Sequence, residues 1–530
     1  MIEVEVHQQL RAFLREQGEP YWPHHLTMAR LVARALRLGR SALIQAGAPS
    51  GYHGRYRLSY LMPLLLWHEP AILVASEAVQ QRLLMVEIPR LRQWIVAKKS
   101  IQTGDCWPDP EFQGLLLTTP QAWLSDRLYQ EGRFPVGILT VIDGVDDLED
   151  WTRSLLTTRL GSQDWNDLMQ CYPDQADEIR DARVQLTCSI FQHPVNPYDR
   201  YLLETPEQAV LEDLYQTLLE DRAAESSQQD ANRQEENREV DTLPHNWQAL
   251  QEQLASRDQL LWTEVARPQG QFSLHSAPAE VASVLEPVWA QQPVVLIGGA
   301  LDLETDAPTF RQRLGLGDLT CVKFSPDRQH ELIQLYLPDG LPMPNTPQFQ
   351  PILMQEVRAL LNATNTAKQG LTVLLVGDMP LKAQVGSMLA AEFGSRVQVE
   401  KTCLDENGIL ISGWEFWRQH QAVLPAPHLL VITTLPLPSL EDPLVAGRVA
   451  HYKRARQDWF RLYLLPEALT ELQRAIAPVR ESQGVVALLD NRVNHRTYGQ
   501  QVLTAMSPLA RINYVDASLF TQFEGLGARD

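Results

Sequence analysis

The stretch from Val136 to Asp150, VGILTVIDGVDDLED, constrains the fold more than any other part of this chain. Five apolar or β-branched residues run directly into Asp143, and further acids follow. Such a run, bounded by polar residues, is typical of a buried central strand of a parallel sheet. In a nucleotide-hydrolysing α/β domain, the acid at the end of that strand holds Mg²⁺ and the next carboxylate polarises a water molecule. Here Gly144 comes next, so the stretch alone is equally compatible with a strand that enters a solvated acidic loop.

The chain is long and acidic, which limits the classes of protein it can belong to. At 530 residues it has room for roughly three domains of about 100–200 residues each. Hydrophobic residues make up 44% and charged residues 21%, an ordinary balance for a globular protein with sizeable cores. Because 46 basic residues stand against 65 acidic ones, the net charge of −19 argues against a strong general nucleic-acid binder. A local basic groove remains compatible with this balance.

Five cysteines lie far apart in the sequence, with no CxxC pair: Cys106, Cys171, Cys188, Cys321 and Cys403. This usage is typical of the reducing cytosol and argues against disulfides, a zinc knuckle or a four-cysteine iron–sulfur site. No apolar run reaches the roughly 20 residues that a membrane span needs. The polar, acidic N-terminal stretch does not have the pattern of a secretory signal. We therefore expect a cytoplasmic protein without membrane association.

Strand-like and helix-like segments alternate through the first part of the chain. Apolar residues at helical spacing fill residues 1–40, and short apolar runs follow at 41–47, at 70–76 and from 114 onward. This order indicates an α/β fold with a doubly wound parallel sheet. A second α/β series follows later, with apolar runs at 293–301, 371–378, 407–413, 428–438 and 484–490.

Between these two series, residues 151–258 are expected to be mostly helical and polar. Within them, 220–241 contains almost no apolar residue, so this segment cannot bury enough surface to offset the conformational entropy lost on folding. We therefore expect a disordered or solvated loop at 220–241. The whole chain is expected to form two α/β domains, with a helical insert interrupting the first.

Three motifs in the second α/β series occur in a fixed order. They are HLLVITTLPLPSLEDPLVAGR at 428–448, LLPEAL at 464–469, and GVVALLDNRVNHRTYGQQVL at 484–503. Their order and spacing resemble the C-terminal motor domain of DinG-type and XPD-type superfamily 2 ATP-dependent DNA helicases. That family carries an LPFP-xx-DP loop after a buried strand and then an LP-x-A helix. A strand that ends in D-x-R follows, and YG-x-x-x-L comes after it.

The first half of the chain resembles the same family. YWPHHLTMARLVARAL resembles the adenine-side helix, QAGAPSGYH takes the place of the Walker A loop, and IDGVDDLED matches IDEAHNLED in spacing. The resemblance covers roughly residues 20–505. It implies two RecA-like parallel-sheet domains of the P-loop NTPase type, with an arch-like helical insert in the first. The implied boundaries are 1–150 completed by 259–304 for the first domain, 151–258 for the insert, and 305–530 for the second domain.

The chain departs from the family pattern at the groups that touch nucleotide. Tyr52 and His53 stand where the family has the phosphate-binding lysine and the hydroxyl that holds Mg²⁺. Gly144 replaces the glutamate that activates water, and Pro478 replaces the arginine expected at the γ-phosphate. Asp143 keeps the position of the metal-binding acid. The sequence therefore resembles a degenerate member of the family, without the Walker A lysine.

A remnant of the nucleotide site is expected nonetheless. On the adenine side, the family's arginine and glutamine are replaced by Trp22 and His25. Arg480 fits the second arginine of motif VI only if one residue is deleted. Family members with an iron–sulfur cluster carry four cysteines between motifs Ia and II, whereas only Cys106 lies there, so we expect a packed side chain and no cluster. The predicted remnant consists of His25, Gly47, Gly51, Tyr52, His53, Asp143 and Arg480, with Asp143 as the metal ligand.

These departures predict that hydrolysis is lost while the fold is kept. Removing one charge-stabilising group commonly lowers an enzyme's rate by ~10²–10³. Loss of the lysine, the glutamate and the arginine together should leave hydrolysis near background. We therefore predict a nucleic-acid-associated pseudo-helicase with a binding or scaffold role, partnered by single-stranded DNA or by a DNA-repair or replication protein. ATP and Mg²⁺, which the resemblance implies as cofactors, would bind weakly or not at all.

Two alternative functions remain open at the level of sequence. In the first, the chain is a working ATP-dependent DNA helicase, and Arg55 or Arg57 reaches the phosphates from an inserted loop. In the second, it is a nucleotide-regulated binding module, and the backbone N–H groups of Gly47 and Gly51 hold phosphate without cleaving it.

Overall fold

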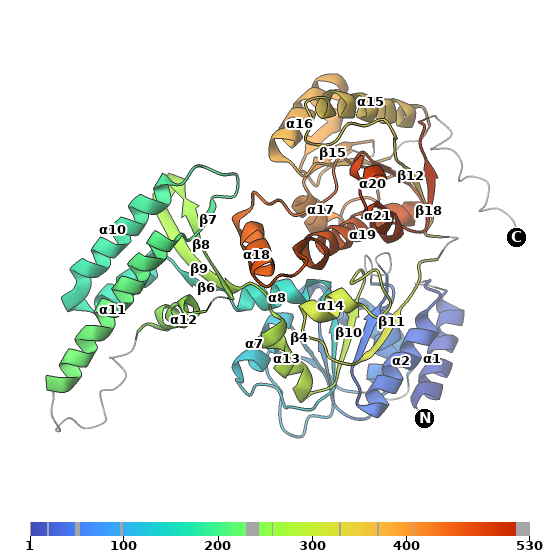
Figure 1. Ribbon diagram of the computed structural model, residues 1–530. Coiled ribbons are helices and arrows are strands. Elements are labelled where there is room, and N and C mark those ends of the chain that lie inside the picture. Colours follow the sequence, from blue (N-terminus) through green and yellow to red (C-terminus); the bar gives the residue numbers. More distant parts are fainter. Residues whose placement is uncertain are drawn as a thin grey trace, which may run out of the picture. The chain divides into compact units, whose positions relative to one another are not determined.

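The chain folds into two compact units, and each unit contains segments from distant parts of the sequence (Figure 1). Unit 1 comprises Met1–Leu148, Val284–Leu437 and Leu464–Asp530, and unit 2 comprises Glu149–Ser283 and Pro438–Tyr463. The computed structural model describes residues 2–18, 21–47, 54–95, 99–228, 243–256, 258–327, 330–367, 370–405 and 407–515. No helix in these ranges combines the length and the apolar character needed to cross a bilayer.

Unit 1 contains a seven-stranded sheet with the predicted Asp143 strand at its centre. The strand order is β11-β1-β10-β5-β2-β4-β3, and all neighbours pair in parallel. Every residue of β5 is buried, with Ile142 opposite Leu296 and Val74. The apolar run therefore lies where both faces of the sheet are covered. The strands are β1 (Ala42–Gln45), β2 (Ala71–Val74), β3 (Ile101–Thr103), β4 (Leu115–Thr118), β5 (Thr140–Asp143), β10 (Val294–Gly298) and β11 (Thr320–Lys323).

Helices cover this sheet through an apolar core. α1 and α2 lie side by side (blue in Figure 1), and both pack against α4. In α2, Met28, Val32 and Leu36 recur every four residues and are all buried. Gly39 ends α2 with a left-handed C-cap (φ 58°). The helices are α1 (Ile2–Gln17), α2 (His25–Leu38), α4 (Arg57–Leu66), α5 (Glu77–Arg82), α6 (Ile88–Arg92), α7 (Pro120–Tyr129), α13 (Ala282–Gln291) and α14 (Pro308–Arg313).

A second seven-stranded parallel sheet in unit 1 is built from the C-terminal half. Its order is β14-β15-β13-β16-β17-β12-β18. Together the two sheets confirm the predicted α/β fold with two parallel-sheet domains. The strands are β12 (Ile333–Tyr336), β13 (Thr372–Leu375), β14 (Val397–Val399), β15 (Ile409–Ser412), β16 (Leu429–Ile432), β17 (Val485–Leu488) and β18 (Leu509–Ile512). The helices are α15 (Phe349–Ala367), α16 (Met379–Phe393), α17 (Trp414–His420), α19 (Leu465–Ser482), α20 (Arg492–His495) and α21 (Gly499–Ala505).

Asp490 explains two of the motifs in this half of the chain. It follows β17, is fully buried, and accepts a hydrogen bond from the backbone N–H of Leu435 in the LPLP loop (2.7 Å). The same carboxylate pairs with Arg492 (2.6 Å), two residues further on in the D-x-R motif. Asn491, between them, donates from its side chain to the carbonyl of Leu341. The D-x-R motif therefore fixes the loop that leaves β16.

Unit 2 contains a four-stranded antiparallel sheet in addition to the expected helices. The strand order is β6-β9-β8-β7, and its helices share a core that includes Trp165 and Trp247. β8 and β9 form a long hairpin whose turn ends at Gly270, at a positive φ of 62°. The elements are β6 (Thr158–Leu160), β7 (Arg200–Leu202), β8 (Gln259–Ala266), β9 (Gln271–Pro278), α9 (Ser162–Cys171), α10 (Ala176–Gln192), α11 (Thr205–Gln228) and α12 (His245–Leu254).

The strand pairing differs from the expected domain boundaries in two places. β8 and β9, within the 259–304 segment expected to complete the first domain, pair in the sheet of unit 2 instead. β11, expected in the second domain, pairs with β1 of the first sheet. Both differences arise because a strand's partner is chosen across long sequence distances, which local patterns do not reveal.

The expected loop at 220–241 also differs in part. α11 continues to Gln228, so the first residues of that segment are helical. The buried residues Leu211, Leu214 and Leu218 anchor the preceding turns, and a polar continuation of an anchored helix needs no core of its own. The remainder, 229–241, lies outside the described residues.

The second segment of unit 2 supplies α18 (Pro443–Arg454), which packs on the antiparallel sheet. Leu260 and Trp262 of β8 form an apolar cluster with Leu444 of this helix. The helix approaches closely at Gly447, where a Cβ atom would lie 3.0 Å from Leu260 and 3.2 Å from Leu202. Glycine therefore lets the helix approach the sheet without displacing the Leu260 and Leu202 side chains.

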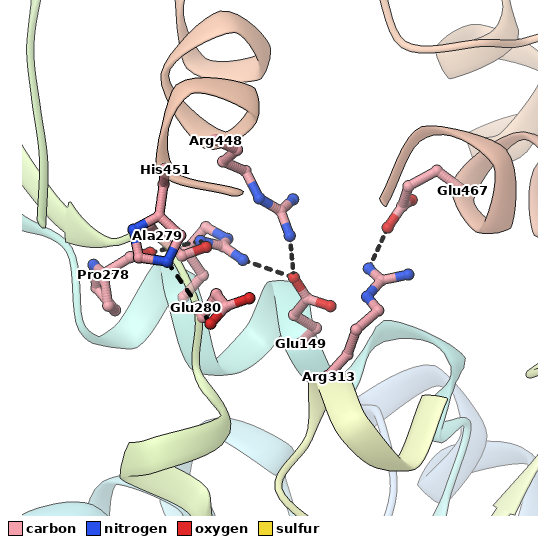
Figure 2. Close-up of polar contacts among 9 residues, drawn as sticks. Glu149, Pro278, Ala279, Glu280, Arg313, Arg448, His451 and Glu467 are labelled. Carbon is pink, nitrogen blue, oxygen red and sulfur yellow. Dashed lines mark hydrogen bonds and ion pairs between the residues drawn. The ribbon is translucent and has the colours of Figure 1, made fainter. Parts of the chain in front are cut away.

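A charged cluster lies beside this contact (Figure 2). The Glu149 carboxylate accepts hydrogen bonds from Arg448 of α18 and from Arg153 (2.6 Å). Arg153 also donates to the carbonyl oxygen of Pro278 (2.5 Å), and the Arg448 guanidinium lies 3.9 Å from the centroid of the Tyr463 ring. Burial and the positive charge of Arg448 lower the pKa of Arg153. One carboxylate thus balances two largely buried arginines.

We expect Glu149→Gln to loosen α18 from the antiparallel sheet of unit 2, because it removes the carboxylate that two neighbouring guanidinium groups share. Backbone amides in 443–454 should then exchange with solvent about 10-fold faster or more, as expected when charged hydrogen bonds are lost. Hydrogen exchange followed by mass spectrometry measures this. Glu392→Gln, which breaks the exposed pair with Arg358, is the matched control and should leave the exchange of α18 unchanged. Equal exchange in both variants would contradict the role assigned to Glu149.

Candidate functional site

Asp143 ends β5 with a buried carboxylate that is already surrounded by protein donors. The hydroxyl groups of Tyr56 and Tyr60 (2.9 Å) both donate to it. The Nε of Arg57 lies 3.3 Å from its Oδ2, which makes a buried ion pair. The acid expected to hold Mg²⁺ is therefore engaged by two phenols and one guanidinium.

The three donors come from the start of α4 and the turn before it. Tyr56 and Tyr60 are four residues apart, so their side chains lie on one face of the helix. The turn depends on Gly54, which has a φ of +62°. A Cβ atom at Gly54 would lie 2.2 Å from the Arg57 guanidinium carbon, so only glycine leaves room for the ion pair.

The electrostatics of this cluster favour a neutral phenol pair beside a charged ion pair. Burial, and next the charge of Asp143, raise the pKa of Tyr56 and of Tyr60 well above the usual value. Burial alone would lower the pKa of Arg57, but the Asp143 carboxylate raises it above its usual value. Both tyrosines therefore stay protonated as donors, and Arg57 stays charged.

This cluster does not fit a magnesium ion. Mg²⁺ requires near-octahedral oxygen ligands, and here a permanent cation and two O–H donors face the only acid of β5. Among the described residues, no group of three His, Cys, Asp or Glu side chains is placed to hold a metal. Cys106, expected to be a packed side chain, is exposed.

Gly144 adopts a backbone conformation that explains its presence. Its φ and ψ are 79° and 34°, in the left-handed region, and its N–H donates to the carbonyl of Ile297 in β10 (2.9 Å). Two residues on, the Asp146 carboxylate accepts from the backbone N–H groups of Gly299 and Ala300, both at 2.8 Å. The acidic loop is thus tied to the end of β10, and its acids act as structural acceptors.

The adenine-side residues are packed against one another. His25 is buried, and its Nδ1 lies 2.9 Å from the hydroxyl oxygen of Ser59. Trp22 is also buried, and its ring centroid lies 5.3 Å from those of His25 and Phe324. These positions are therefore filled by side chains of the chain itself.

The predicted phosphate loop is only partly described. Gly47 donates its backbone N–H to the carbonyl of Gly299 (3.0 Å), so this group continues the pairing of β1 with β10 past the strand ends. Gly51, Tyr52 and His53 lie outside the described residues. The structure therefore places the start of the loop, where the N–H group of Gly47 faces β10.

Arg480 lies in a different environment from the one predicted for it. It is 2% exposed, and its guanidinium donates to the carbonyl oxygens of Met506 (2.6 Å) and Ser507 (3.0 Å). Burial lowers its pKa to about 10. Pro478, two residues earlier, is buried within α19. Arg480 thus fixes the connection to β18, and the structure does not bring it to Asp143.

A different arginine of α19 reaches the acidic loop. Arg474 lies 2.8 Å from the Asp147 carboxylate. Burial opposes its charge, but Asp147 and then Asp146 raise the pKa of Arg474 above its usual value. The sequence did not single out Arg474, because its residue type alone does not reveal which acid it reaches across the fold.

The arginines considered as substitutes for the lost lysine are also paired. Arg57 is bound to Asp143, and Arg55 lies 2.5 Å from the Glu481 carboxylate of α19. Arg313 of α14 pairs in the same way with Glu467 (Figure 2). These arginines, which could otherwise pair with phosphate groups, are thus paired with carboxylates of the chain itself.

Residues 426–509 match the family described as "Helicase C-terminal domain". Two relatives are named ATP-dependent DNA helicase YoaA. The protein of Escherichia coli (strain K12) is 23% identical over 252 residues, and that of Haemophilus influenzae (strain ATCC 51907 / DSM 11121 / KW20 / Rd) is 25% identical over 263. These matches cover 45% and 46% of this chain but only 40% of each relative, so the chain matches less than half the length of these curated relatives.

Solved structures show the same fold over most of the chain. One titled "XPD_APO" has a TM-score of 0.56 and 12% sequence identity, and covers 92% of this chain and 100% of that one. The structure of S. tokodaii Xpd4 also has a TM-score of 0.56 and 12% identity, and covers 93% and 100%. The two parallel-sheet domains thus have the arrangement of elements found in those structures.

We expect Asp143→Asn to destabilise unit 1 strongly, because it leaves the buried Arg57 guanidinium without a counter-charge. Removing one partner of a buried pair costs about 3–5 kcal/mol in the free energy of unfolding. Chemical denaturation of the unaltered chain and of the Asp143→Asn variant measures this loss. The double variant Arg57→Met/Asp143→Asn removes both charges and should recover part of the loss. A stability change for Asp143→Asn within about 0.5 kcal/mol of zero would show that the ion pair is not structural.

Proposed function

We propose that this relative of the DinG/XPD-type superfamily 2 helicases binds nucleic acid or a protein partner without ATP-driven turnover. In this pseudo-helicase, the two RecA-like domains and the insert serve as a binding scaffold. The relatives it matches are named as ATP-dependent DNA helicases. Like these relatives, the chain would associate with DNA, but it would not act as an ATP-driven motor.

The observation that carries the proposal is the engagement of Asp143 by Tyr56, Arg57 and Tyr60. Phosphoryl transfer needs this acid to hold Mg²⁺ while a lysine and an arginine neutralise developing charge. Binding Mg²⁺ here would require three donors to leave a buried carboxylate. Their departure would also leave Arg57 as a buried charge without a partner, which is costly.

Two further features support the same conclusion. The backbone of Gly144 has a left-handed conformation that a glutamate residue rarely adopts. A single substitution back to glutamate would therefore strain the backbone. Arg480 and Pro478 are buried within the second domain and do not face the acidic loop. Several groups that nucleotide binding and hydrolysis need are therefore missing from their expected positions at the same time.

The organisation of unit 2 favours a scaffold role. Residues 149–283 are inserted in the first half of the chain and 438–463 in the second, yet both segments fold into one unit. The Glu149–Arg448 pair and the Gly447 contact hold them together. One unit therefore presents residues from both halves of the chain, as a binding scaffold can use.

The two alternative functions receive less support. A compensated helicase would need Arg55 or Arg57 at the phosphates, but each is paired with an acid. A nucleotide-regulated module would use the N–H groups of Gly47 and Gly51. The N–H group of Gly47 already donates to Gly299, and Gly51 lies outside the described residues. Among the described groups, both alternatives would therefore require existing contacts to break before phosphate binds.

We expect the purified chain to show no ATP turnover, with or without single-stranded DNA. Steady-state phosphate release should stay far below ~1 s⁻¹, the low end for enzymes. Equilibrium binding of labelled ATP, measured with and without Mg²⁺, should also be absent. Turnover near ~1 s⁻¹ would refute the proposal in favour of a working helicase. ATP binding without turnover would favour the nucleotide-regulated module.

Nucleic-acid binding is tested separately, through the salt dependence of oligo(dT) binding. Each phosphate contact of a single strand contributes about −0.7 to the slope of log K against log salt concentration. We expect a measurable negative slope that ATP does not change. A slope near zero would restrict the scaffold role to protein partners.

We expect Gly144→Glu to restore no hydrolysis and to lower the free energy of unfolding by about 1–2 kcal/mol, because the side chain is strained at a φ of 79°. Denaturation and phosphate-release assays on the same sample measure both effects. Gly340→Glu is the matched control, since this exposed glycine has an ordinary φ and nothing within 4 Å of an added Cβ. Appearance of turnover in Gly144→Glu alone would contradict the proposal.

A further inference from the structure

A groove with basic edges runs along α2, on the first domain of unit 1. One part of it, about 650 Å³ in volume, lies between α1 and α2 and includes Val4, His7 and Arg30 in its lining. A second part of about 200 Å³ lies between α2 and the strands β1 and β11 and includes Leu38 and Val322. Leu31 and Arg34 line both parts. The two parts therefore flank one exposed ridge of α2.

Arginines follow this ridge at helical spacing. Arg30, Arg34 and Arg37 are four and three residues apart, so they share one face of α2, and Arg40 follows just after the helix ends. Arg37 is paired with Glu3 (2.7 Å). Arg30 and Arg34 are exposed, and within the described part of the chain neither forms an ion pair. A basic strip is thus displayed on a chain whose net charge is −19.

The basic strip carries a cost for the helix itself. Like charges four residues apart destabilise a helix by about 0.2–0.5 kcal/mol per pair. No acidic residue lies in the first turn of α2, where it would favour the helix dipole. A solvated surface helix usually mixes both signs of charge. The arrangement is therefore better suited to an anionic partner than to water alone.

Apolar side chains line the same groove. Val4 is 50% exposed and Leu38 is 39% exposed, one on each side of the ridge. Val322, on the edge strand β11, and Leu31 are half-buried beside them. A partner that covered the groove would bury these side chains and gain the associated hydrophobic free energy.

We propose that this groove binds an acidic amphipathic segment of a partner protein. Its Asp and Glu side chains would pair with Arg30 and Arg34, and its apolar side chains would cover Val4, Leu31 and Leu38. Single-stranded nucleic acid fits less well, because the residues that line the groove include no Phe, Tyr or Trp side chain on which bases could stack, and His7 is the one aromatic ring among them. The site is distinct from the Asp143 cluster and does not depend on the proposed loss of hydrolysis.

The test uses the full chain and a fluorescein-labelled helical peptide of about 15 residues with leucine on one face and glutamate on the other. Fluorescence anisotropy should show saturable binding. Arg30→Glu/Arg34→Glu should weaken it about 10-fold or more, which corresponds to about 1.4 kcal/mol. The matched control is Arg11→Glu/Arg15→Glu, the same charge change on exposed positions of α1, and it should bind like the unaltered chain.

Three outcomes would overturn the proposal. The first is no saturable binding of the peptide by the unaltered chain. The second is equal binding by both double variants, which would reflect overall charge alone. The third is oligo(dT) binding that Arg30→Glu/Arg34→Glu abolishes while the peptide does not bind, which would assign the groove to nucleic acid. Circular dichroism of both double variants confirms that the fold is kept, so weaker binding cannot be ascribed to unfolding.

Discussion

The rest of the first parallel-sheet domain depends on the buried ion pair between Arg57 and Asp143. A carboxylate at the end of a central strand must be satisfied, because an unpaired buried charge is costly. In this chain the first turns of α4 satisfy it, with two phenols added to the guanidinium. The cluster makes α4, the turn at Gly54 and β5 dependent on one another.

The surrounding contacts follow the same logic. Asp146 holds the backbone after β10, Asp147 holds Arg474, and Arg480 holds the approach to β18. On the adenine side, Trp22 and His25 fill the space with aromatic packing. Described charged and polar residues at the positions where the family resemblance predicts nucleotide contacts thus make contacts within the chain. These partners satisfy their charges and hydrogen-bonding groups and so stabilise the fold.

Much of the fold was accessible from the sequence, but the site was accessible only in part. The continuous apolar run before Asp143 identified a central strand, since such runs need cover on both faces. The β8–β9 hairpin and the pairing of β11 with β1 were missed, because strand partners depend on distant segments. Arg480 was assigned to the site by its place in a motif, whereas its side chain turns toward backbone carbonyls. Arg474 was missed because no motif singled it out, although its side chain pairs with Asp147.

The sequence by itself determined the α/β class, the central position of Asp143 and the absence of a lysine at the phosphate loop's expected position. The first two follow from residue type and period, which local physics fixes, whereas the third rests on the resemblance to the helicase family. Only the tertiary structure decided what Asp143 binds and that Arg474, and not Arg480, reaches the acidic loop. It also decided that residues 149–283 and 438–463 fold into one unit. Such outcomes depend on which side chains meet across the fold, because a buried charge without a partner raises the free energy of the folded state.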